Sequence, residues 1–255
     1  MADPREVLII EDEPVVLKAA GMALAAHGIG YEVATDVTGA AARLNDTSFK
    51  VVVSDLKLPG ESGFEILRLS KRISPSPQVI IITGYATVEN ALQSFELGSF
   101  DFLPKPFDVE ELTSVVTRAL RFASLPEAEP AITKEQYFLG RHSWAQLDPE
   151  GTATLGVAET LSGVMGPLEA IDCMESGDIV VQGKCFCQMN SADGLTHRVW
   201  APLSGRIITR NQAVTEDLEL IRLDPFAAGW LVRVIPSSLE KELPRITQPE
   251  GTLSG

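Results

Sequence analysis

The fold is decided by VLIIEDEP at residues 7–14 and VVVSD at residues 51–55. Each stretch begins with a short apolar run rich in β-branched residues and ends in carboxylates. Such runs are typical of strands in a parallel sheet that is covered on both faces. A third run, Val79–Thr83, and two weaker ones at residues 31–34 and 102–103 follow along the chain. We therefore expect five parallel strands in the first half of the sequence.

Helical patterns lie between these strands and after the last one, at residues 15–26, 38–45, 63–73, 87–97 and 109–122. Strands that alternate with helices predict a doubly wound α/β sheet, because right-handed crossovers place the helices on both faces. Ligands of such sheets collect at the carboxyl ends of the strands. Residues 1–122 are therefore predicted to form one domain with its site at that edge.

The pattern changes after residue 122. Residues 123–135 contain two prolines and several acidic residues, which is typical of a linker. Residues 136–238 consist of short strand-like stretches separated by turn signals, so we expect a mostly β domain. Residues 239–255 are rich in Pro, Ser, Gly and charge and are predicted to form a flexible tail.

Charge and composition exclude several classes of protein. The formal charge of −14 divides into −6 for residues 1–122 and −8 for residues 123–255, whereas a DNA-binding domain normally has a basic face. No apolar run approaches the roughly 20 residues that cross a bilayer, and the N-terminus lacks a secretory pattern. We expect a cytoplasmic protein that binds neither nucleic acid nor membrane.

The cysteines predict no special chemistry. Cys173, Cys185 and Cys187 are odd in number and form no Cys-x-x-Cys pair. Neither a disulfide framework nor a zinc site is therefore indicated, and the three are expected to be small core residues. Alternation along a strand would place Cys185 and Cys187 on one face.

Carboxylates and two further polar residues follow the ends of the predicted parallel strands. Glu11 and Asp12 follow the first strand, and Asp55 follows the third. Like charges about 4 Å apart repel by roughly 4 kcal/mol near a surface, so the cluster is expected to hold a cation, and hard oxygen ligands favour Mg²⁺. Thr83 and Lys105 can bind phosphate oxygens there. We interpret Asp55 as a nucleophile toward phosphorus.

The strings that carry this chemistry are IEDEP at 10–14, DLKLPGESG at 55–63, TGYA at 83–86 and DFLPKPF at 101–107. Over residues 5–122 they resemble the receiver domain of two-component response regulators. The resemblance implies phosphorylation of Asp55 by a sensor histidine kinase or phosphotransfer protein, with Mg²⁺ held by Glu11, Asp12 and Asp55. It also implies a switch that moves Thr83 and turns Phe102 inward, with a plain core aromatic as the alternative interpretation of Phe102. Two residues that flank the phosphate are expected to tune its lifetime, namely Lys57 and Tyr85.

The second half contains none of the common effector signatures: no helix-turn-helix, no Walker-type loop and no metal pair at helical spacing. Its strings are HSW at 142–144, ATLGVA at 153–158, GPLEAI at 166–171, APLSGRI at 201–207 and DPFAAGWLV at 224–232. Together they resemble the H protein of the glycine cleavage system, a lipoyl-domain fold of two small sheets forming a flattened barrel.

The family's lipoyl-bearing lysine falls at Gly194, or at Asp193 or Leu195 if the count slips by one. None of these residues is a lysine, so no lipoate is expected. Asp193-Gly194 is instead a signal for a type I′ hairpin turn.

The leading hypothesis is a signalling adaptor whose H-like domain binds an unidentified downstream protein, with receiver dimerisation as one means of control. It would be no enzyme beyond its own phosphoryl transfer and dephosphorylation. One alternative is a regulator or decoy in lipoate and glycine cleavage metabolism. Another is a transcription regulator with an unrecognised DNA surface.

Overall fold

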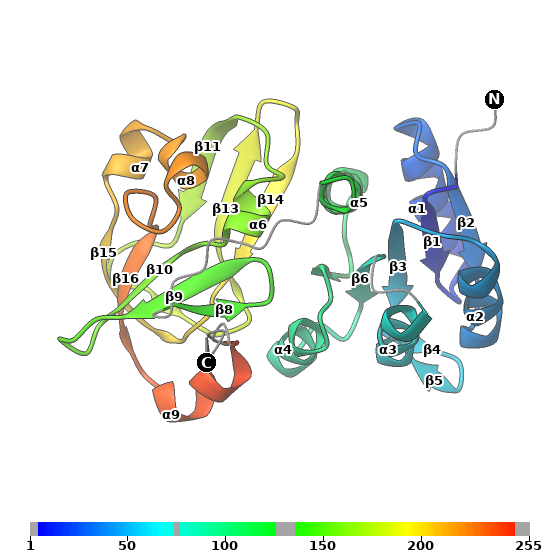
Figure 1. Cartoon of the computed structure of the whole chain (residues 1–255), viewed down its shortest axis with the longest axis horizontal. Helices are drawn as coiled ribbons and strands as arrows, with labels where there is room; N and C mark the ends of the chain where they lie inside the picture. The colour runs from blue at the N-terminus through cyan, green and yellow to red at the C-terminus, as the bar shows by residue number, and fades with distance from the viewer. Residues whose placement is uncertain (1–4, 74–76, 126–135, 248–255) are drawn as a thin grey trace, which may run out of the picture. The chain divides into compact units, whose positions relative to one another are not determined.

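The computed structural model describes residues 5–73, 77–125 and 136–247 (Figure 1). The chain divides into two compact units, with the division after Pro126. Most of the predicted linker, residues 126–135, lies outside the described residues. Within the described ranges, no helix is both long enough and apolar enough to cross a membrane.

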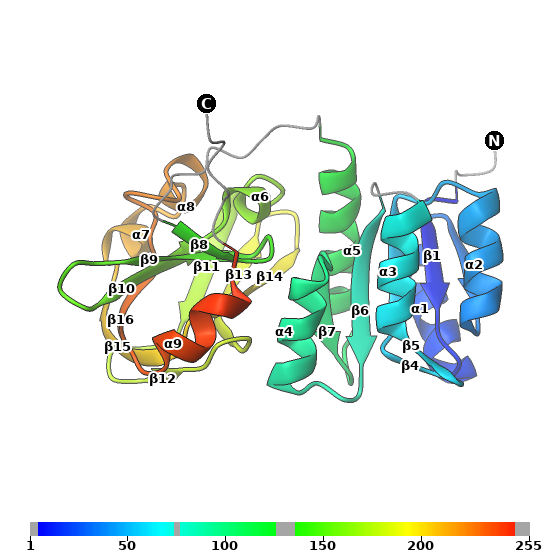
Figure 2. The same cartoon turned by 60° about the horizontal axis from the view of Figure 1, so that its bottom comes forward.

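The first unit alternates strands and helices, as predicted. Its elements are β1 (Val7–Ile10), α1 (Pro14–Ala26), β2 (Tyr31–Ala34), α2 (Val37–Asp46), β3 (Val51–Asp55), β4 (Lys57–Leu58), β5 (Glu61–Ser62), α3 (Gly63–Ile73), β6 (Gln78–Thr83), α4 (Val88–Glu96), β7 (Asp101–Pro104) and α5 (Val109–Ala123). Five strands form one sheet in the order β2-β1-β3-β6-β7, and every neighbouring pair is parallel. The predicted doubly wound parallel sheet is confirmed (Figure 2).

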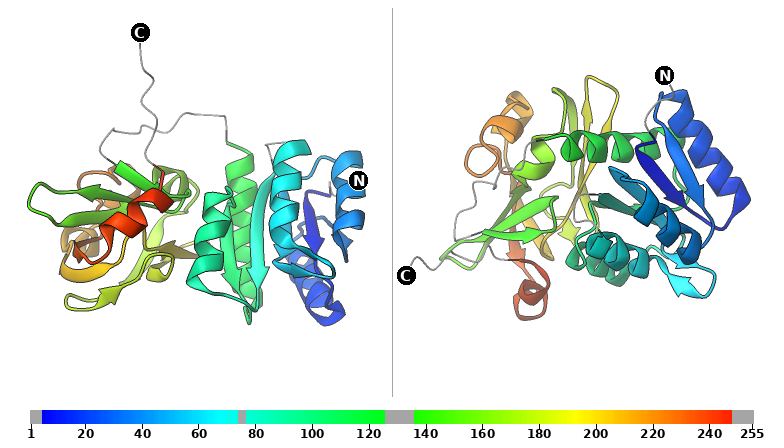
Figure 3. Two further views of the ribbon diagram at one scale, coloured as in Figure 1. Left: turned by 90° about the horizontal axis from the view of Figure 1, so that it is seen from below. Right: turned by 45° about the vertical axis from the view of Figure 1, so that its right-hand side comes forward.

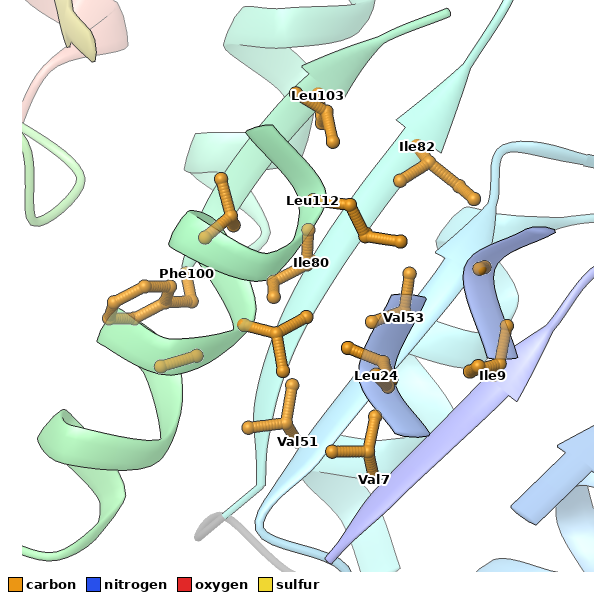
Figure 4. Packing of buried hydrophobic residues seen from close by; sticks show 14 residues of the cluster. Val7, Ile9, Leu24, Val51, Val53, Ile80, Ile82, Phe100, Leu103 and Leu112 are labelled. Carbon is orange, nitrogen blue, oxygen red and sulfur yellow. The ribbon is translucent and has the colours of Figure 1, made fainter. Parts of the chain in front are cut away.

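The strand period of two divides the apolar side chains between two helix layers. Val7, Ile9, Val51 and Val53 face the layer made by α1 and α5, and they form a buried cluster with Leu24 and other residues (Figure 4). The intervening residues of β1, β3 and β6 are buried too, on the side covered by α3 and its neighbours (Figure 3). Burial on both faces explains why these strands are continuously apolar.

The second unit is built from two antiparallel sheets. Its elements are β8 (Gln136–Leu139), β9 (Ser143–Leu147), β10 (Ala153–Val157), α6 (Glu159–Ser162), β11 (Leu168–Cys173), β12 (Ile179–Val180), β13 (Cys185–Ser191), β14 (Thr196–Trp200), β15 (Gly205–Arg210), α7 (Ala213–Glu216), α8 (Leu220–Leu223), β16 (Val232–Pro236), α9 (Leu239–Glu242) and the 3₁₀ turn η1 (Leu243–Arg245). One sheet has the order β12-β15-β16-β10-β9-β8, and the other has the order β11-β13-β14. The prediction of a mostly β domain is confirmed.

Side chains from both sheets meet in one core. Ser143 of β9 donates a buried hydrogen bond to the carbonyl of Trp200 in β14, 2.6 Å away, which joins the two sheets. The indole of Trp144 packs against Phe226, with ring centroids 5.8 Å apart. It also lies over Gly156, where a Cβ atom would come within 2.6 Å of the ring. This contact therefore depends on a residue without a side chain at position 156.

Three expectations for this unit were wrong. Cys173 and Cys187 form a disulfide, because they are directly opposite each other on β11 and β13. Cys185 is exposed, so it is not a core residue. The flexible tail predicted from residue 239 is ordered as far as residue 247, where Thr247 pairs with Phe138 of β8. Residues 248–255 lie outside the described residues.

The β13–β14 hairpin also differs from its predicted turn type. A type I′ turn requires positive φ at both central residues. In the loop at residues 192–195 only Gly194 has positive φ, at 79°. Gly194 donates its backbone N–H to the carbonyl of Ser191, and Ser191 donates its own to Leu195. These two bonds indicate a type I turn followed by a left-handed glycine, which is a common longer hairpin connection.

Candidate functional site

Three carboxylates meet at the carboxyl edge of the parallel sheet. β1 and β3 are paired in register up to Ile10 and Ser54, so Glu11, Asp12 and Asp55 leave neighbouring strands at the same level. One ligand oxygen from each of them lies within 4.8 Å of the others. Glu11 and Asp55 are buried, whereas Asp12 is partly open to solvent. The sequence therefore predicted the position of this cluster correctly.

Lys105 supplies a positive charge at the centre of the cluster. It follows β7, and its backbone N–H donates to the carbonyl of Thr83 at the end of β6. Its Nζ lies 2.7 Å from Glu11 Oε2 and 2.9 Å from Asp55 Oδ2. The side chain of Lys105 is only 13% exposed, so water screens these ion pairs weakly. One ammonium thus faces at least three carboxylates.

Burial and charge shift the pKa values of two of these groups. Burial raises the pKa of Glu11, as does the nearby charge of Asp55, and the hydrogen bond from Lys105 only partly offsets this. Burial alone would lower the pKa of Lys105. Its hydrogen bonds to Glu11 and Asp55 outweigh burial, so the pKa of the ammonium is raised and Lys105 stays charged at neutral pH.

The hydroxyl of Thr83 lies at the end of the strand next to Asp55. Asp55 pairs with Ile82 across β3 and β6, one residue before Thr83. Thr83 is fully buried, and its Oγ1 accepts a hydrogen bond from the backbone N–H of Tyr85 at 2.9 Å. Above it, the exposed Lys57 donates from Nζ to the hydroxyl of Tyr85, also at 2.9 Å. This contact raises the pKa of Lys57.

The donor set fits Mg²⁺. Three carboxylates offer hard oxygen ligands, and their charge exceeds that of the single ammonium in contact with them. Glu11, Asp12 and Asp55 are the residues that would hold the ion. Bound there, it would add positive charge beside Asp55, as a phosphoryl group requires when it approaches a carboxylate.

Comparisons with known proteins divide the chain in the same way. A family model described as response regulator receiver domain matches residues 7–117, and one described as glycine cleavage H-protein matches residues 136–251. A probable glycine cleavage system H protein of Pyrococcus abyssi is 30% identical over 114 residues, which are 45% of this chain and 84% of that protein. The chain belongs to the glycine cleavage H-protein family, and its residues 7–117 form a response regulator receiver domain. Both resemblances inferred from the sequence are confirmed.

The chain spans only part of the length of transcriptional regulators such as NtrC. The DNA-binding transcriptional regulator NtrC of Azospirillum brasilense is 35% identical over 129 residues, which are 49% of this chain but only 26% of NtrC. A CheY-like response regulator receiver domain protein from Methanospirillum hungatei JF-1 is a solved structure with 26% identity and a TM-score of 0.45. It covers 47% of this chain and 96% of its own. The similarity to regulators therefore concerns the receiver domain.

The receiver domain contains two site features that the sequence did not single out. Glu13 brings a third carboxylate to Lys105, with Oε1 3.4 Å from Nζ. Gly63 is packed so tightly that a Cβ atom there would lie 2.1 Å from the carbonyl oxygen of Asp55. The sequence shows Glu13 in the string EDE and Gly63 at the start of a predicted helix. Neither pattern reveals the contact itself.

Phe102 lies beside a buried ion pair. Phe102 is 2% exposed and pairs with Ile81 in the sheet. The preceding residue, Asp101, accepts a hydrogen bond from the backbone N–H of Phe102, and its other oxygen lies 2.8 Å from Nη2 of Arg118 in α5. Both side chains of this pair are at most 2% exposed. The strand that carries Phe102 is thus attached to α5 by charge as well as by apolar packing.

Proposed function

We propose that the receiver domain is phosphorylated on Asp55, with Mg²⁺ held by Glu11, Asp12 and Asp55. The observation that supports this most is the ammonium of Lys105 between Glu11 and Asp55, 2.9 Å from the Asp55 oxygen. A carboxylate oxygen of Asp55 attacks phosphorus, and the bond from phosphorus to the donor breaks. Lys105 and the hydroxyl of Thr83 then bind oxygens of the transferred group.

The phosphate donor in this proposal is a sensor histidine kinase or a phosphotransfer protein, since receiver domains take phosphate from histidine kinases. Such a partner requires the chain to reside in the cytoplasm. Thr83 and Phe102 would form the switch. The carbonyl of Thr83 accepts a hydrogen bond from the backbone N–H of Lys105, and Lys105 directly follows β7, the strand that contains Phe102. Lys57 and Tyr85 cover the site from outside and would set the lifetime of the acyl phosphate.

The experiment uses acetyl phosphate with Mg²⁺. The full chain should gain one phosphoryl group by intact mass, whereas Asp55→Asn should gain none. Asp46→Asn is the matched control, because Asp46 is an exposed carboxylate at the end of α2. Equal labelling of the Asp55 and Asp46 variants would contradict the proposal. In the same assay, Lys57→Ala and Tyr85→Ala should change the half-life of the phosphate.

We further propose that the H-protein domain carries no lipoate and acts as a protein-binding output. The position expected for the lipoyl lysine corresponds to Gly194, in a hairpin loop whose residues 192–195 include no amine. Lys184 lies before β13, at the other end of that strand. Intact mass after coexpression with a lipoate ligase tests this, and a lipoyl adduct would favour the alternative role in lipoate or glycine cleavage metabolism.

DNA binding is the less supported alternative for the output. NtrC is a DNA-binding regulator by name, but the match covers only 26% of it. Residues 123–255 of this chain carry a charge of −8, which repels phosphates. A pull-down that compares beryllofluoride-treated wild type with Asp55→Asn would identify the downstream protein. Light scattering of the same two samples would test receiver dimerisation.

A further inference from the structure

All three cysteines of the chain gather at one place in the H-protein domain. Cys173 ends β11 and is directly opposite Cys187 on β13, and the two form a disulfide with Cα atoms 4.0 Å apart. Their side chains are 6% and 1% exposed, respectively. Cys185 lies two residues before Cys187 and is exposed. A buried disulfide and an accessible thiol are therefore close neighbours.

A β-bulge gives Cys185 and Cys187 opposite environments. Residues i and i+2 of a regular strand share a face. Here the register with β14 shifts, so that Cys185 pairs with Trp200 and Cys187 with the adjacent Val199. The extra residue in β13 turns Cys185 outward and keeps Cys187 inside. The Cys185 thiol donates to the carbonyl of Cys187, with Sγ 3.4 Å from the oxygen, so it lies against the backbone of the disulfide.

The three cysteines line a single surface hollow of about 380 Å³. Asp172, Glu175 and Asp178 also line it, and all three are exposed. Glu175 forms an ion pair with Arg210. Among the described residues, that arginine forms no ion pair with the other two carboxylates of the hollow, Asp172 and Asp178. A reagent entering the hollow therefore meets an exposed thiol in an acidic surrounding.

We propose that Cys173, Cys185 and Cys187 form a thiol–disulfide exchange site in which Cys185 is the entry thiol. Cys185 loses its proton, and its Sγ bonds to one sulfur of the disulfide. The bond between Cys173 and Cys187 breaks, and the cysteine that leaves takes up a proton. This step conserves electrons and brings a disulfide sulfur to the surface. A dithiol then attacks Cys185, is oxidised to its own disulfide, and leaves three protein thiols.

Charge indicates the class of thiol that fits. The carboxylates Asp172 and Asp178 repel an anionic thiol and attract a cationic one, while an uncharged thiol is indifferent to them. The preferred substrates are therefore uncharged or cationic dithiols and thiols. The inference does not depend on phosphorylation of the receiver domain.

The test follows reduction of the full chain by roughly 0.1 mM dithiothreitol, an uncharged dithiol, with acid-quenched alkylation and mass spectrometry. Untreated protein should carry one alkylatable thiol per chain. Direct attack on sulfurs that are 1% and 6% exposed requires β11 and β13 to open, so Cys185→Ser should slow reduction by about tenfold or more. Gln188→Ser is the matched control, because Gln188 is an exposed residue of the same strand that lines the same hollow. It should reduce at the wild-type rate.

The site of alkylation gives a second readout that needs no variant. After incubation at pH 8 without reductant, a fraction of the protein should be alkylated at Cys173 or Cys187 instead of Cys185. Alkylation at Cys185 alone, equal reduction rates for wild type and Cys185→Ser, or three thiols in the untreated protein would each overturn the proposal.

The preference for charge is tested with cysteamine, 2-mercaptoethanol and 2-mercaptoethanesulfonate. Each rate is divided by the rate of the same thiol with an uncharged model disulfide. The ratio should fall from cation to anion, and the differences should shrink at high salt. A constant ratio would overturn the assigned substrate class.

Discussion

Lys105→Met should destabilise the receiver domain when Mg²⁺ is absent. Carboxylates that lie up to 4.8 Å apart repel by about 3–4 kcal/mol at an effective dielectric of 20, and Lys105 is the cation that contacts both Glu11 and Asp55. Each of its two charge-assisted hydrogen bonds contributes about 1.5–3 kcal/mol. The loss has an upper bound, because Glu11 can escape the repulsion by taking up a proton. At pH 7 that protonation costs about 3–4 kcal/mol from an ordinary pKa of 4.5.

The expected loss is therefore about 2–4 kcal/mol, which corresponds to a roughly 30- to 900-fold loss of protection from hydrogen exchange. Hydrogen exchange read by mass spectrometry on peptides that cover β1 and β3 reports on this domain alone, which a global unfolding curve of a two-unit chain does not. The measurement is made at pH 7 in EDTA. Saturating Mg²⁺ should restore much of the lost protection, since the ion replaces the missing positive charge.

Lys57→Met is the control for this variant. Lys57 contacts Tyr85 at the surface, so its replacement should leave the exchange of β1 and β3 within threefold of wild type. Near pH 4 Glu11, whose pKa is raised, takes up a proton, and the difference in protection between Lys105→Met and wild type should narrow. If β1 and β3 of Lys105→Met exchange within threefold of wild type at pH 7, the ammonium does not balance the carboxylates and the reasoning fails.

Three further outcomes follow from the receiver domain. Gly63→Ala should push the Asp55 carbonyl away and slow phosphorylation by acetyl phosphate at least about tenfold, whereas Gly84→Ala, with open space around it, should not. Asp101→Ala strands a fully buried guanidinium and should cost about 3–5 kcal/mol, read as lost hydrogen-exchange protection of peptides that cover β7 and α5. Because the pKa of Glu11 is raised by burial, its carboxylate costs stability as the pH rises above 4.5 through that raised pKa. In EDTA, the stability of Glu11→Gln relative to wild type should therefore rise between pH 4 and pH 8.

The sequence predicted the layout of the receiver site because that layout follows from strand order. Parallel strands that end at one level bring the residues after them together, so Glu11, Asp12 and Asp55 could be grouped without a structure. Their burial could not be predicted in the same way. Glu11 is fully buried and its neighbour Asp12 is not, a difference set by which way each side chain turns after the strand. The burial of Glu11 consequently raises its pKa.

The errors in the second unit arise from single-residue shifts and long-range pairing. An odd number of cysteines excludes complete pairing, but it does not exclude one disulfide, and nothing local shows that Cys173 is opposite Cys187. The bulge at residue 186 then separates Cys185 from Cys187, although strand periodicity places them on one face. A shift of one residue in one strand thus changed a predicted core thiol into an exposed one.

The tip of the β13–β14 hairpin supports a scaffold role through its backbone as well as its composition. Gly194 has φ of 79°, a region that costs a residue with a side chain about 1–2 kcal/mol. The loop is also held by Ser191, whose hydroxyl donates to Asp193 at 2.5 Å and lies 2.9 Å from Nε2 of the buried His197. A lysine at 194 would have to adopt a strained conformation within a fixed turn. A Cβ atom at 194 would meet open space, so the cost of Gly194→Lys is the backbone strain of about 1–2 kcal/mol alone.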